Sequence, residues 1–393
     1  MGDAVVVSAA RTPIADARRG ALANVPIYEL GKVVVAEALK RSGIPPDDID
    51  DIILGEVMQG GGDMARYIAL DLGLPPDTPG LALNRQCGTG LQAVNSAAAT
   101  IRAGMDKVVI AGGLESMTQT PMTFAKSPLP WGGMSPWMSM SHPANDPDAP
   151  TTIMGITVGE NTAEQCGITR EQQDEWSYHS HMRAIAAIDD GRFAEEIVSV
   201  EVPAGRGEVR IFDTDEHPRR DTSLEKLAKL PALFKKDGTV TAGNSSSLND
   251  GSCAMVVVDD TYAQANGLQP MAVIRSWAAA GVPPKETGQA PTIAIPRALE
   301  RAGLKTDDVK LVEINEAFAS MAVASSRILG FPHEMVNVNG GAVGLGHPVA
   351  CSGARILTTL IYELRRRGGG YGVASLCAGG GMGIATVVEV LPG

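Results

Sequence analysis

The sequence predicts an α/β fold built from two similar halves, and two observations carry that prediction. Short apolar segments such as 4–9 (AVVVSA) and 107–111 (KVVIA) alternate with stretches of helical periodicity, which is typical of a largely parallel sheet covered by helices. The chain also repeats itself, because ALKRSGIPPDDIDDIILGEV from Ala38 aligns without gaps with ALERAGLKTDDVKLVEINEA from Ala298. Its 393 residues suit two or three domains.

The elements of the first half follow from local signals in order along the chain. The helical stretch that starts at Ile27 stops at Gly43, because glycine tolerates the left-handed backbone that closes helices. Proline and aspartate residues then make a turn into the next strand. The expected elements are strands at 4–9, 49–54 and 107–111, a helix at 27–42 and a helix after Cys87 that ends at Gly104.

The repeat also divides the chain into parts. Residues 1–118 form the first half, which a segment at about 250–270 completes, and residues 271–393 form the second half. Between them we expect an inserted loop domain at 119–249, rich in Pro, Met and Trp at its start. Long insertions of this kind usually cover a site, although the Met/Trp stretch could equally be a core or subunit-contact patch.

Composition excludes several classes of function. The net charge of −12 and the lack of a basic block argue against a nucleic-acid partner. Five widely spaced cysteines without a CxxC motif indicate neither a disulfide framework nor a metal site. The N-terminus is expected to be a strand instead of a signal peptide, and no apolar run reaches membrane-spanning length. We therefore expect a cytoplasmic protein without a membrane partner.

Cys87, in the segment NRQCGTG, is the first candidate for chemistry. It stands at the expected start of a helix, where free N–H groups and the helix dipole favour a thiolate, the nucleophilic form of cysteine. The alternative is a buried structural cysteine. At the repeat shift of 260 residues, Cys87 falls on His347 (347 − 87 = 260), and both precede a helix rich in small residues.

Three further segments carry candidate residues at strand ends or strand-to-helix turns, where α/β sheets bind ligands. They are Asn315 in NEAFA, His347 in NGGAVGLGHP, and Cys377 in SLCAGGGMG. A thiolate could attack a thioester while a histidine takes the thiol proton, and a second cysteine could move a proton next to a second thioester. The N–H groups of Gly379, Gly380 and Gly381 could hold an oxyanion, and Asn315 a water.

Each of these residues also has a plainer interpretation. His347 could be a loop histidine, Asn315 a turn or cap residue, and the glycine run a tight turn. We interpret Cys166 and Cys253 as structural, and Cys351 as packing beneath the helix that follows His347.

Taken together, these segments resemble the thiolase family, which comprises the acetyl-CoA acetyltransferases and the 3-ketoacyl-CoA thiolases. The similarity covers essentially the whole chain and includes ARTPI, AGGLESM and KKDGTVTAGNSSSLNDGSCAMVV. It implies duplicated βαβαβαββ halves in a five-layered αβαβα arrangement with an inserted loop domain. It also implies a homodimer or homotetramer, and CoA and acyl-CoA as substrates with no permanently bound cofactor and no metal.

The resemblance assigns a role to each candidate. Cys87 is the acylated nucleophile, and His347 activates it and forms an oxyanion hole with a water held by Asn315. Cys377 is the acid/base for the α-proton. The backbone N–H groups of Cys87 and Gly379 form a second oxyanion hole. The CoA contacts fall on two further residues, Arg219 in DEHPRR and Ser246 in GNSSS.

The sequence departs from the family's pattern in three segments. Met154 stands where acetoacetyl-specific members have histidine, and Thr287 replaces the methionine of PKIMG. Both are expected to line the acyl-tail region, so they leave room for a longer or bulkier acyl group. Ala350 and Cys351 in GHPVACSG replace smaller residues, and this change should leave the mechanism intact.

We therefore expect a thiolase that reversibly cleaves or forms 3-ketoacyl-CoA in fatty acid or other lipid metabolism, with a degradative role slightly favoured. One alternative is a non-catalytic acyl-CoA or lipid-binding protein that keeps the fold. Another is a ketoacyl-synthase-type condensing enzyme, against which Cys377 argues. No GxGxxG follows the first strand, which disfavours a dinucleotide-binding dehydrogenase.

Overall fold

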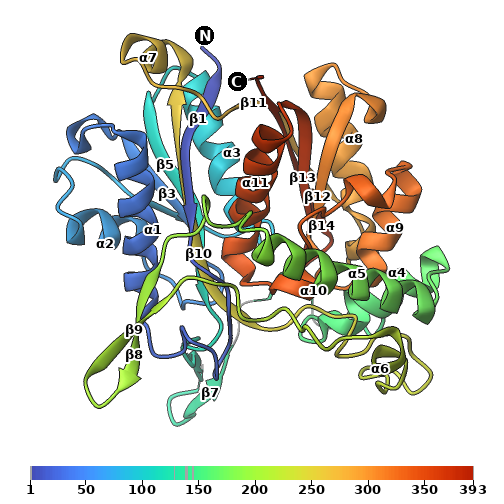
Figure 1. The fold of residues 1–393 in the computed structure, drawn as a ribbon. Coiled ribbons are helices and arrows are strands. Elements are labelled where there is room, and N and C mark those ends of the chain that lie inside the picture. Colours follow the sequence, from blue (N-terminus) through green and yellow to red (C-terminus); the bar gives the residue numbers. More distant parts are fainter. Residues whose placement is uncertain (1, 128, 138–139, 144–145, 393) are drawn as a thin grey trace.

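A single ten-stranded sheet runs through the computed structural model, which describes residues 2–127, 129–137, 140–143 and 146–392. Its strands are β1 (Ala4–Arg11), β2 (Ala15–Asp16), β3 (Asp51–Gly55), β4 (Leu81–Leu83), β5 (Val108–Ser116), β10 (Asn249–Asp259), β11 (Ala272–Gly281), β12 (Val309–Ile314), β13 (Gly370–Ala378) and β14 (Met382–Val390). The order is β12-β13-β14-β11-β1-β10-β5-β3-β4, with β2 paired to β10. The strands of each half therefore lie together, and the halves meet where β1 pairs with β11 (Figure 1).

Helices cover this sheet, and four strands form two separate hairpins. The helices are α1 (Ile27–Ser42), α2 (Met64–Asp71), α3 (Thr89–Arg102), α4 (Asn161–Cys166), α5 (Arg170–Asp189), α6 (Leu224–Ala228), α7 (Asp260–Ala265), α8 (Pro291–Ala302), α9 (Ala319–Leu329), α10 (Ala342–Leu345) and α11 (Val349–Arg366). The hairpins pair β6 (Phe124–Lys126) with β7 (Met134–Pro136) and β8 (Val200–Gly205) with β9 (Glu208–Phe212). None of the helices among the described residues has the length and hydropathy needed to cross a membrane.

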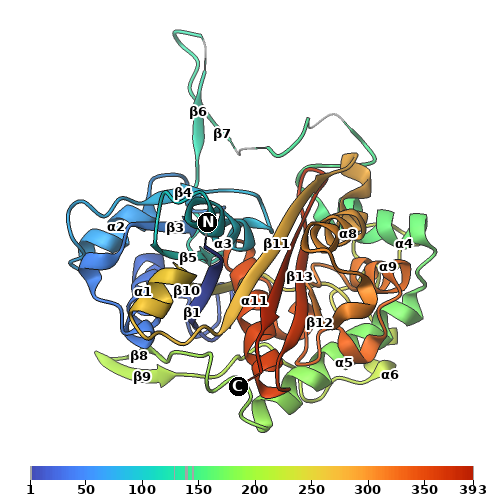
Figure 2. The ribbon, with the colours of Figure 1, turned by 90° about the horizontal axis from the view of Figure 1, so that it is seen from above.

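The apolar cores show that the molecule has five layers. One core lies between α1, α2 and the outer face of the first half-sheet, and another lies between α8, α9 and the outer face of the second. The central core joins α3 and α11 to the inner faces of both half-sheets. Viewed from above, the layers follow one another as helices, sheet, helices, sheet, helices (Figure 2). The αβαβα arrangement is confirmed.

The two halves repeat at the shift found in the sequence. A 3-10 turn at Pro46–Asp48 matches one at Thr306–Asp308 (306 − 46 = 260), and α3 starts 260 residues before α11 (349 − 89 = 260). The helix stops match as well, because Gly43 ends α1 with a φ of 68° and Gly303 ends α8 with a φ of 71°. The predicted helix at 27–42 is therefore confirmed to the residue.

The sheet is mixed, so the expectation of a largely parallel sheet is wrong. Only the pairs β3–β4, β3–β5 and β12–β13 are parallel among the described strands. The strands β10 and β14 run antiparallel to both of their main neighbours. A strand buried on both faces is apolar throughout whichever way its neighbours run, so its composition does not reveal its direction.

The inserted segment between β5 and β10 lies over both halves. Its helices α4 and α5 pack on α9 and α10 of the second half (Figure 1). Its hairpin β8–β9 contributes Val200, Val202 and Phe212 to the core around α1. The hairpin β6–β7 extends away from the body of the molecule (Figure 2).

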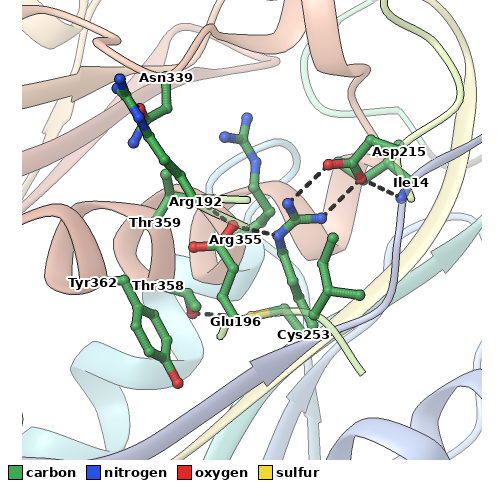
Figure 3. Close-up of polar contacts among 12 residues, drawn as sticks. Ile14, Arg192, Glu196, Asp215, Cys253, Asn339, Arg355, Thr358, Thr359 and Tyr362 are labelled. Atoms are coloured by element: carbon green, nitrogen blue, oxygen red, sulfur yellow. Dashed lines mark hydrogen bonds and ion pairs between the residues drawn. The ribbon is translucent and has the colours of Figure 1, made fainter. Parts of the chain in front are cut away.

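A buried ionic cluster fastens this segment to the first strand (Figure 3). Arg11 of β1 donates from Nε to Glu196 at 2.6 Å and from its two terminal nitrogens to Asp215 at 2.8 Å each. All three side chains are buried. Such a buried ionic cluster is costly to break, because removal of one partner leaves an uncompensated charge. The cluster therefore fixes the path of the segment beneath the sheet.

The two central helices approach each other closely at their first turns. A Cβ atom on Gly90 of α3 would lie 2.6 Å from the carbonyl oxygen of Ala350, and one on Gly353 of α11 would lie 2.3 Å from the backbone nitrogen of Leu91. Real Cβ atoms do not approach backbone so closely, so glycine is required at both positions. This contact brings the N-terminal ends of α3 and α11 together.

We expect Gly353→Ala to lower the free energy of unfolding by about 1–3 kcal/mol, because the added methyl group would force the two helices apart. Urea unfolding followed by circular dichroism measures this change. Gly281→Ala is the matched control, since a Cβ atom there meets nothing within 4 Å. Equal stability of the two variants would contradict the close packing.

Candidate active site

Cys87 is presented by a tight turn immediately before α3. Gln86 has a φ of 50°, a backbone conformation that costs energy for a residue other than glycine. The turn is held by Thr89, whose hydroxyl accepts from the N–H of Arg85 at 2.8 Å and donates to the carbonyl of Gln86 at 2.5 Å. Cys87 is partly exposed as a result, and it lies at the start of α3 as predicted.

A glycine turn between β13 and β14 faces Cys87. The N–H of Gly379 donates to the Cys87 thiol, and Gly380 and Gly381 have φ values of 91° and 80°. Cys377 lies at the end of β13 just before this turn and is buried. The structure therefore brings Cys87, Cys377 and Gly379 together.

His347 lies in the turn that leads into α11 and is held at two points. Its N–H donates to Oδ1 of Asn249 at 2.8 Å. Its Nδ1 lies 2.6 Å from Oγ of Ser352, and that hydroxyl donates to the carbonyl of Pro348 at 2.9 Å. Since the serine proton is already used, Nδ1 must be the donor in the neutral ring. The other nitrogen, Nε2, is then free to accept a proton.

Asn315 lies beside this nitrogen and is its hydrogen-bond donor. Its Nδ2 is 3.5 Å from Nε2 of His347, and its backbone N–H donates to the carbonyl of Ser375 at 2.9 Å. Its Oδ1 is buried and has no hydrogen-bond partner among the described protein atoms. A buried amide with one open acceptor is suited to hold a water molecule.

The contact between α3 and α11 unites these two groups of residues. Cys87 stands two residues before α3, and His347 stands two residues before α11. Leu248, which forms a β-bridge with His347, lines the same cleft as Cys87. The four predicted segments therefore converge on one region.

Burial decides the protonation of these side chains. It raises the pKa of Cys87 to about 11, although the N–H of Gly379 acts in the opposite direction. Burial, with a smaller contribution from the positive charge of Arg355, lowers the pKa of His347 to about 3. Burial and then the neighbouring Cys87 raise the pKa of Cys377. The directions of these shifts favour two thiols and an uncharged imidazole in the resting site at neutral pH, whereas the helix start alone favours a thiolate at Cys87.

In such a site, protons can move between side chains that are uncharged before the reaction starts. A neutral imidazole with an unprotonated Nε2 can accept a proton from a thiol as that thiol attacks a carbonyl carbon. The N–H groups at the start of α3 and at Gly379 are fixed donors for the oxygen that becomes negative. A second thiol with a raised pKa is a proton donor.

A cleft of about 1440 Å³ opens onto Cys87 and Gly379. Arg219 and Ser246, the predicted CoA contacts, both line it, and Met154 lies in its wall. Thr287 does not line it, so the expectation that Thr287 contacts an acyl tail is wrong. The side chain of Thr287 is fully buried and contacts the glycine turn instead.

Three other cysteines lie outside this chemistry, as predicted. Cys253 is buried and its Sγ lies 3.2 Å from the hydroxyl of Thr358 (Figure 3). Cys351 on α11 packs against Cys253 and Ala354. Cys166 ends α4 in another part of the molecule. No cluster of potential metal ligands occurs among the residues that the structure describes.

Two further residues position His347 and were not predicted from the sequence. Asn249 holds the backbone of His347, and Ser352 sets its tautomer. The signal for Ser352 was available, because it lies one helical turn from His347. Asn249 lies 98 residues away in the chain, and only the fold brings it to the site.

Comparisons with known proteins agree with this geometry. The family model of the thiolase N-terminal domain matches residues 4–261, and that of the thiolase C-terminal domain matches residues 268–390. An acetyl-CoA acetyltransferase of Syntrophomonas wolfei is 43% identical, with 99% of each chain covered. A 3-ketoacyl-CoA thiolase of Bacillus subtilis is also 43% identical, over 99% of this chain and 100% of the relative. The crystal structure of a Bacillus anthracis acetyl-CoA acetyltransferase superposes with a TM-score of 0.90 at 42% identity, covering 100% of this chain and 99% of the other.

The pH dependence of alkylation tests the protonation of Cys87. With a pKa of about 11, the thiolate fraction rises with pH throughout the neutral range. We therefore expect the rate of iodoacetamide labelling at Cys87 to increase by about tenfold per pH unit between about pH 7 and pH 10. Peptide mapping identifies the labelled thiol, with Cys87→Ala as the control. A rate that is already constant between about pH 6 and pH 8 would show a thiolate at rest and would contradict the assignment.

Proposed function

Because the chain belongs to the thiolase family, we propose that it cleaves and forms 3-ketoacyl-CoA through an acyl group carried on Cys87. Thiolases are acyltransferases that exchange acyl groups between CoA thioesters, and this chain is an enzyme of that class. The observation that carries the residue assignment is the position of Cys87 under the Gly379 amide, beside a second buried cysteine. A condensing enzyme with one catalytic cysteine has no use for that second thiol.

The first step in the cleavage direction breaks a carbon–carbon bond. The Cys87 thiol gives its proton to Nε2 of His347 as Sγ attacks the keto carbon of the substrate. The bond between C2 and C3 then breaks, which leaves the acyl group on Cys87 and an enolate of acetyl-CoA. The Cys377 thiol donates the proton that turns this enolate into acetyl-CoA. The imidazolium of His347, together with a water held by Asn315, stabilises the enolate oxygen.

The second step transfers the acyl group to a new CoA. The CoA thiol gives its proton to the Cys377 thiolate and attacks the acyl carbon on Cys87. The N–H groups of Cys87 and Gly379 hold the oxyanion that forms there. When the tetrahedral intermediate collapses, the Cys87 sulfur leaves and regains its proton from His347. The free enzyme is restored, and every step is reversible.

The cleft walls support binding of CoA as a substrate. We assign Arg219 and Ser246 as CoA contacts, since both line the cleft that leads to Cys87. Both belong to the proposed loop domain at 119–249, between the half that ends at 118 and the half at 271–393. A guanidinium group can pair with the phosphates of CoA, which the acidic chain otherwise has little charge to attract. We infer that no permanently bound cofactor is needed.

The acyl specificity is inferred from the cleft wall. Met154 stands in this wall where acetoacetyl-specific members have histidine, and other apolar side chains, including Phe234 and Phe318, lie along the same cleft. This wall favours acyl groups larger than acetyl. We therefore propose a degradative role in fatty acid metabolism, in the cytoplasm.

Exposed apolar side chains support association of several copies. The hairpin of β6 and β7 carries Trp131 and Met134, which are 97% and 70% exposed, and Leu129, which is 69% exposed. Apolar side chains at the tip of a projecting hairpin are costly to leave in water. We propose a homodimer or homotetramer in which this hairpin contacts another copy.

Protection by substrate tests the nucleophile. We expect acetyl-CoA to slow iodoacetamide labelling of Cys87 at least tenfold, because the acyl group occupies Sγ. Thiolysis rates over straight and branched 3-ketoacyl-CoA substrates then measure the acyl preference. Labelling that is insensitive to acetyl-CoA, or that falls on Cys166 or Cys253, would contradict the assignment.

The Cys377→Ser variant tests the division of work between the two thiols. A hydroxyl is a far weaker acid than a thiol, so proton transfer to and from the α-carbon should fall by roughly 100-fold or more. Transfer of an acetyl group from acetyl-CoA to Cys87 needs no α-proton and should continue. Trapping of acetyl enzyme from labelled acetyl-CoA, compared with acetoacetyl-CoA thiolysis, measures both steps. Equal losses in both assays would refute the separate roles.

A further inference from the structure

Thr287 lies in a 3-10 turn, Pro284–Gln289, between β11 and α8. Its side chain is fully buried, and its hydroxyl makes two hydrogen bonds. It donates to the carbonyl of Pro284 at 2.5 Å and accepts from the N–H of Gly381 at 3.0 Å. Both the proton and an acceptor site of the hydroxyl are therefore used, and the second bond links this turn to the glycine turn after β13.

A residue just before this 3-10 turn also forms a hydrogen bond with Gly381. The N–H of Val282 donates to the carbonyl of Gly381 at 2.7 Å. With a φ of 80°, Gly381 also lies so close that an added Cβ would be 2.1 Å from the carbonyl oxygen of Val282. The N–H and the carbonyl of Gly381 are thus both hydrogen-bonded to the segment that connects β11 and α8.

Gly379, two residues earlier in the same turn, faces the reaction centre. Its N–H donates to the Cys87 thiol, while a Cβ atom placed on it would meet nothing closer than the Gln86 side chain at 3.7 Å. The adjacent Gly380 lies close to another segment, since an added Cβ would be 2.8 Å from the carbonyl oxygen of Ser141, but Gly379 itself has space around it. The direction of the Gly379 N–H is set by the two ends of the turn, which are β13 on one side and Gly381 on the other.

We propose that Thr287 is a positioning residue, whose hydroxyl fixes Gly381 and thereby aims the Gly379 N–H at Cys87. This inference rests on the proposed function, in which that N–H holds the oxyanion of the acyl-transfer step. An apolar side chain of equal size at 287 would leave the buried Gly381 N–H without a partner. The turn would then have to move to find another partner, and the Gly379 N–H would move with it.

The test compares Thr287→Val, which removes the hydroxyl at constant size, with Thr287→Ser, which keeps it. One hydrogen bond contributes on the order of a 3- to 10-fold effect. We expect Thr287→Val to lower kcat for thiolysis by about this factor with an unchanged KM for CoA, because the residues assigned as CoA contacts, Arg219 and Ser246, lie outside the glycine turn. Thr287→Ser should retain most of the wild-type kcat.

The rate of iodoacetamide labelling at Cys87 distinguishes a positioning role from a purely structural one, because a purely structural role would leave this rate unchanged. The Gly379 N–H opposes the rise in the Cys87 pKa, so a misaimed N–H should raise that pKa further. We expect iodoacetamide labelling of Thr287→Val at a fixed pH near 8 to be slower by a similar factor, with the pH profile displaced to higher pH. Thr292→Val is the matched control, since Thr292 donates to the carbonyl of Gln289 at 2.7 Å on the adjoining helix, away from the glycine turn.

Each result decides the proposal. An unchanged labelling profile in Thr287→Val would overturn it, and so would equal effects in the Val and Ser variants. If Thr287→Val does not fold, Thr287→Ala provides the same measurement, and loss of folding in both would assign Thr287 a structural role instead. A displaced labelling profile in an enzyme that shows no thiolysis in its wild-type form would refute the proposed function while leaving the positioning role intact.

Discussion

The contact between α3 and α11 is the constraint on which the site depends. Cys87 and His347 lie at the starts of these helices, and the helices meet at backbone distance because Gly90 and Gly353 carry no side chain. The rest of the fold stabilises this contact, because the two half-sheets enclose the helix pair and bury its apolar faces. A larger residue at either glycine would move Cys87 and His347 apart without any change to either side chain.

Enclosure of the helix pair also sets the chemistry of the site. The burial that joins the helices disfavours charge on both Cys87 and His347 and so favours a neutral resting pair. The proton must therefore move as the substrate binds and reacts, and the amide N–H groups that meet the developing charge must already be in place. The groups around the site must therefore be held in place in advance. Two buried hydrogen bonds do this, one between Ser352 and His347 and one between Thr287 and the glycine turn.

Features that depend on neighbours in sequence could be predicted, and features that depend on distant partners could not. Gly43 marked a helix end and the repeat related Cys87 to His347, because both signals lie in local patterns. Thr287 was misplaced because its partner Gly381 lies 94 residues away, and the motif at 287 gives no sign of it. The direction of β10 was missed for a related reason, since a strand buried on both faces has the same composition in either direction.

The duplication explains how one fold holds both halves of the site. Glu115 near the end of β5 and Cys377 near the end of β13 occupy matching positions, each paired with a glycine of the next strand, Gly251 or Gly383. Each contacts the segment at the start of the helix of the opposite half, since Glu115 accepts from the N–H of Ala350 in α11 and Cys377 lies beside Cys87 before α3.

The connections that follow β5 and β13 then differ. After β13 a short glycine turn supplies the amide facing Cys87, whereas after β5 the long inserted segment builds the cleft wall. The symmetric core thus brings Cys87, His347 and Cys377 to one region, and the asymmetry of these two connections places the glycine turn on one side of the cleft and the inserted segment on the other.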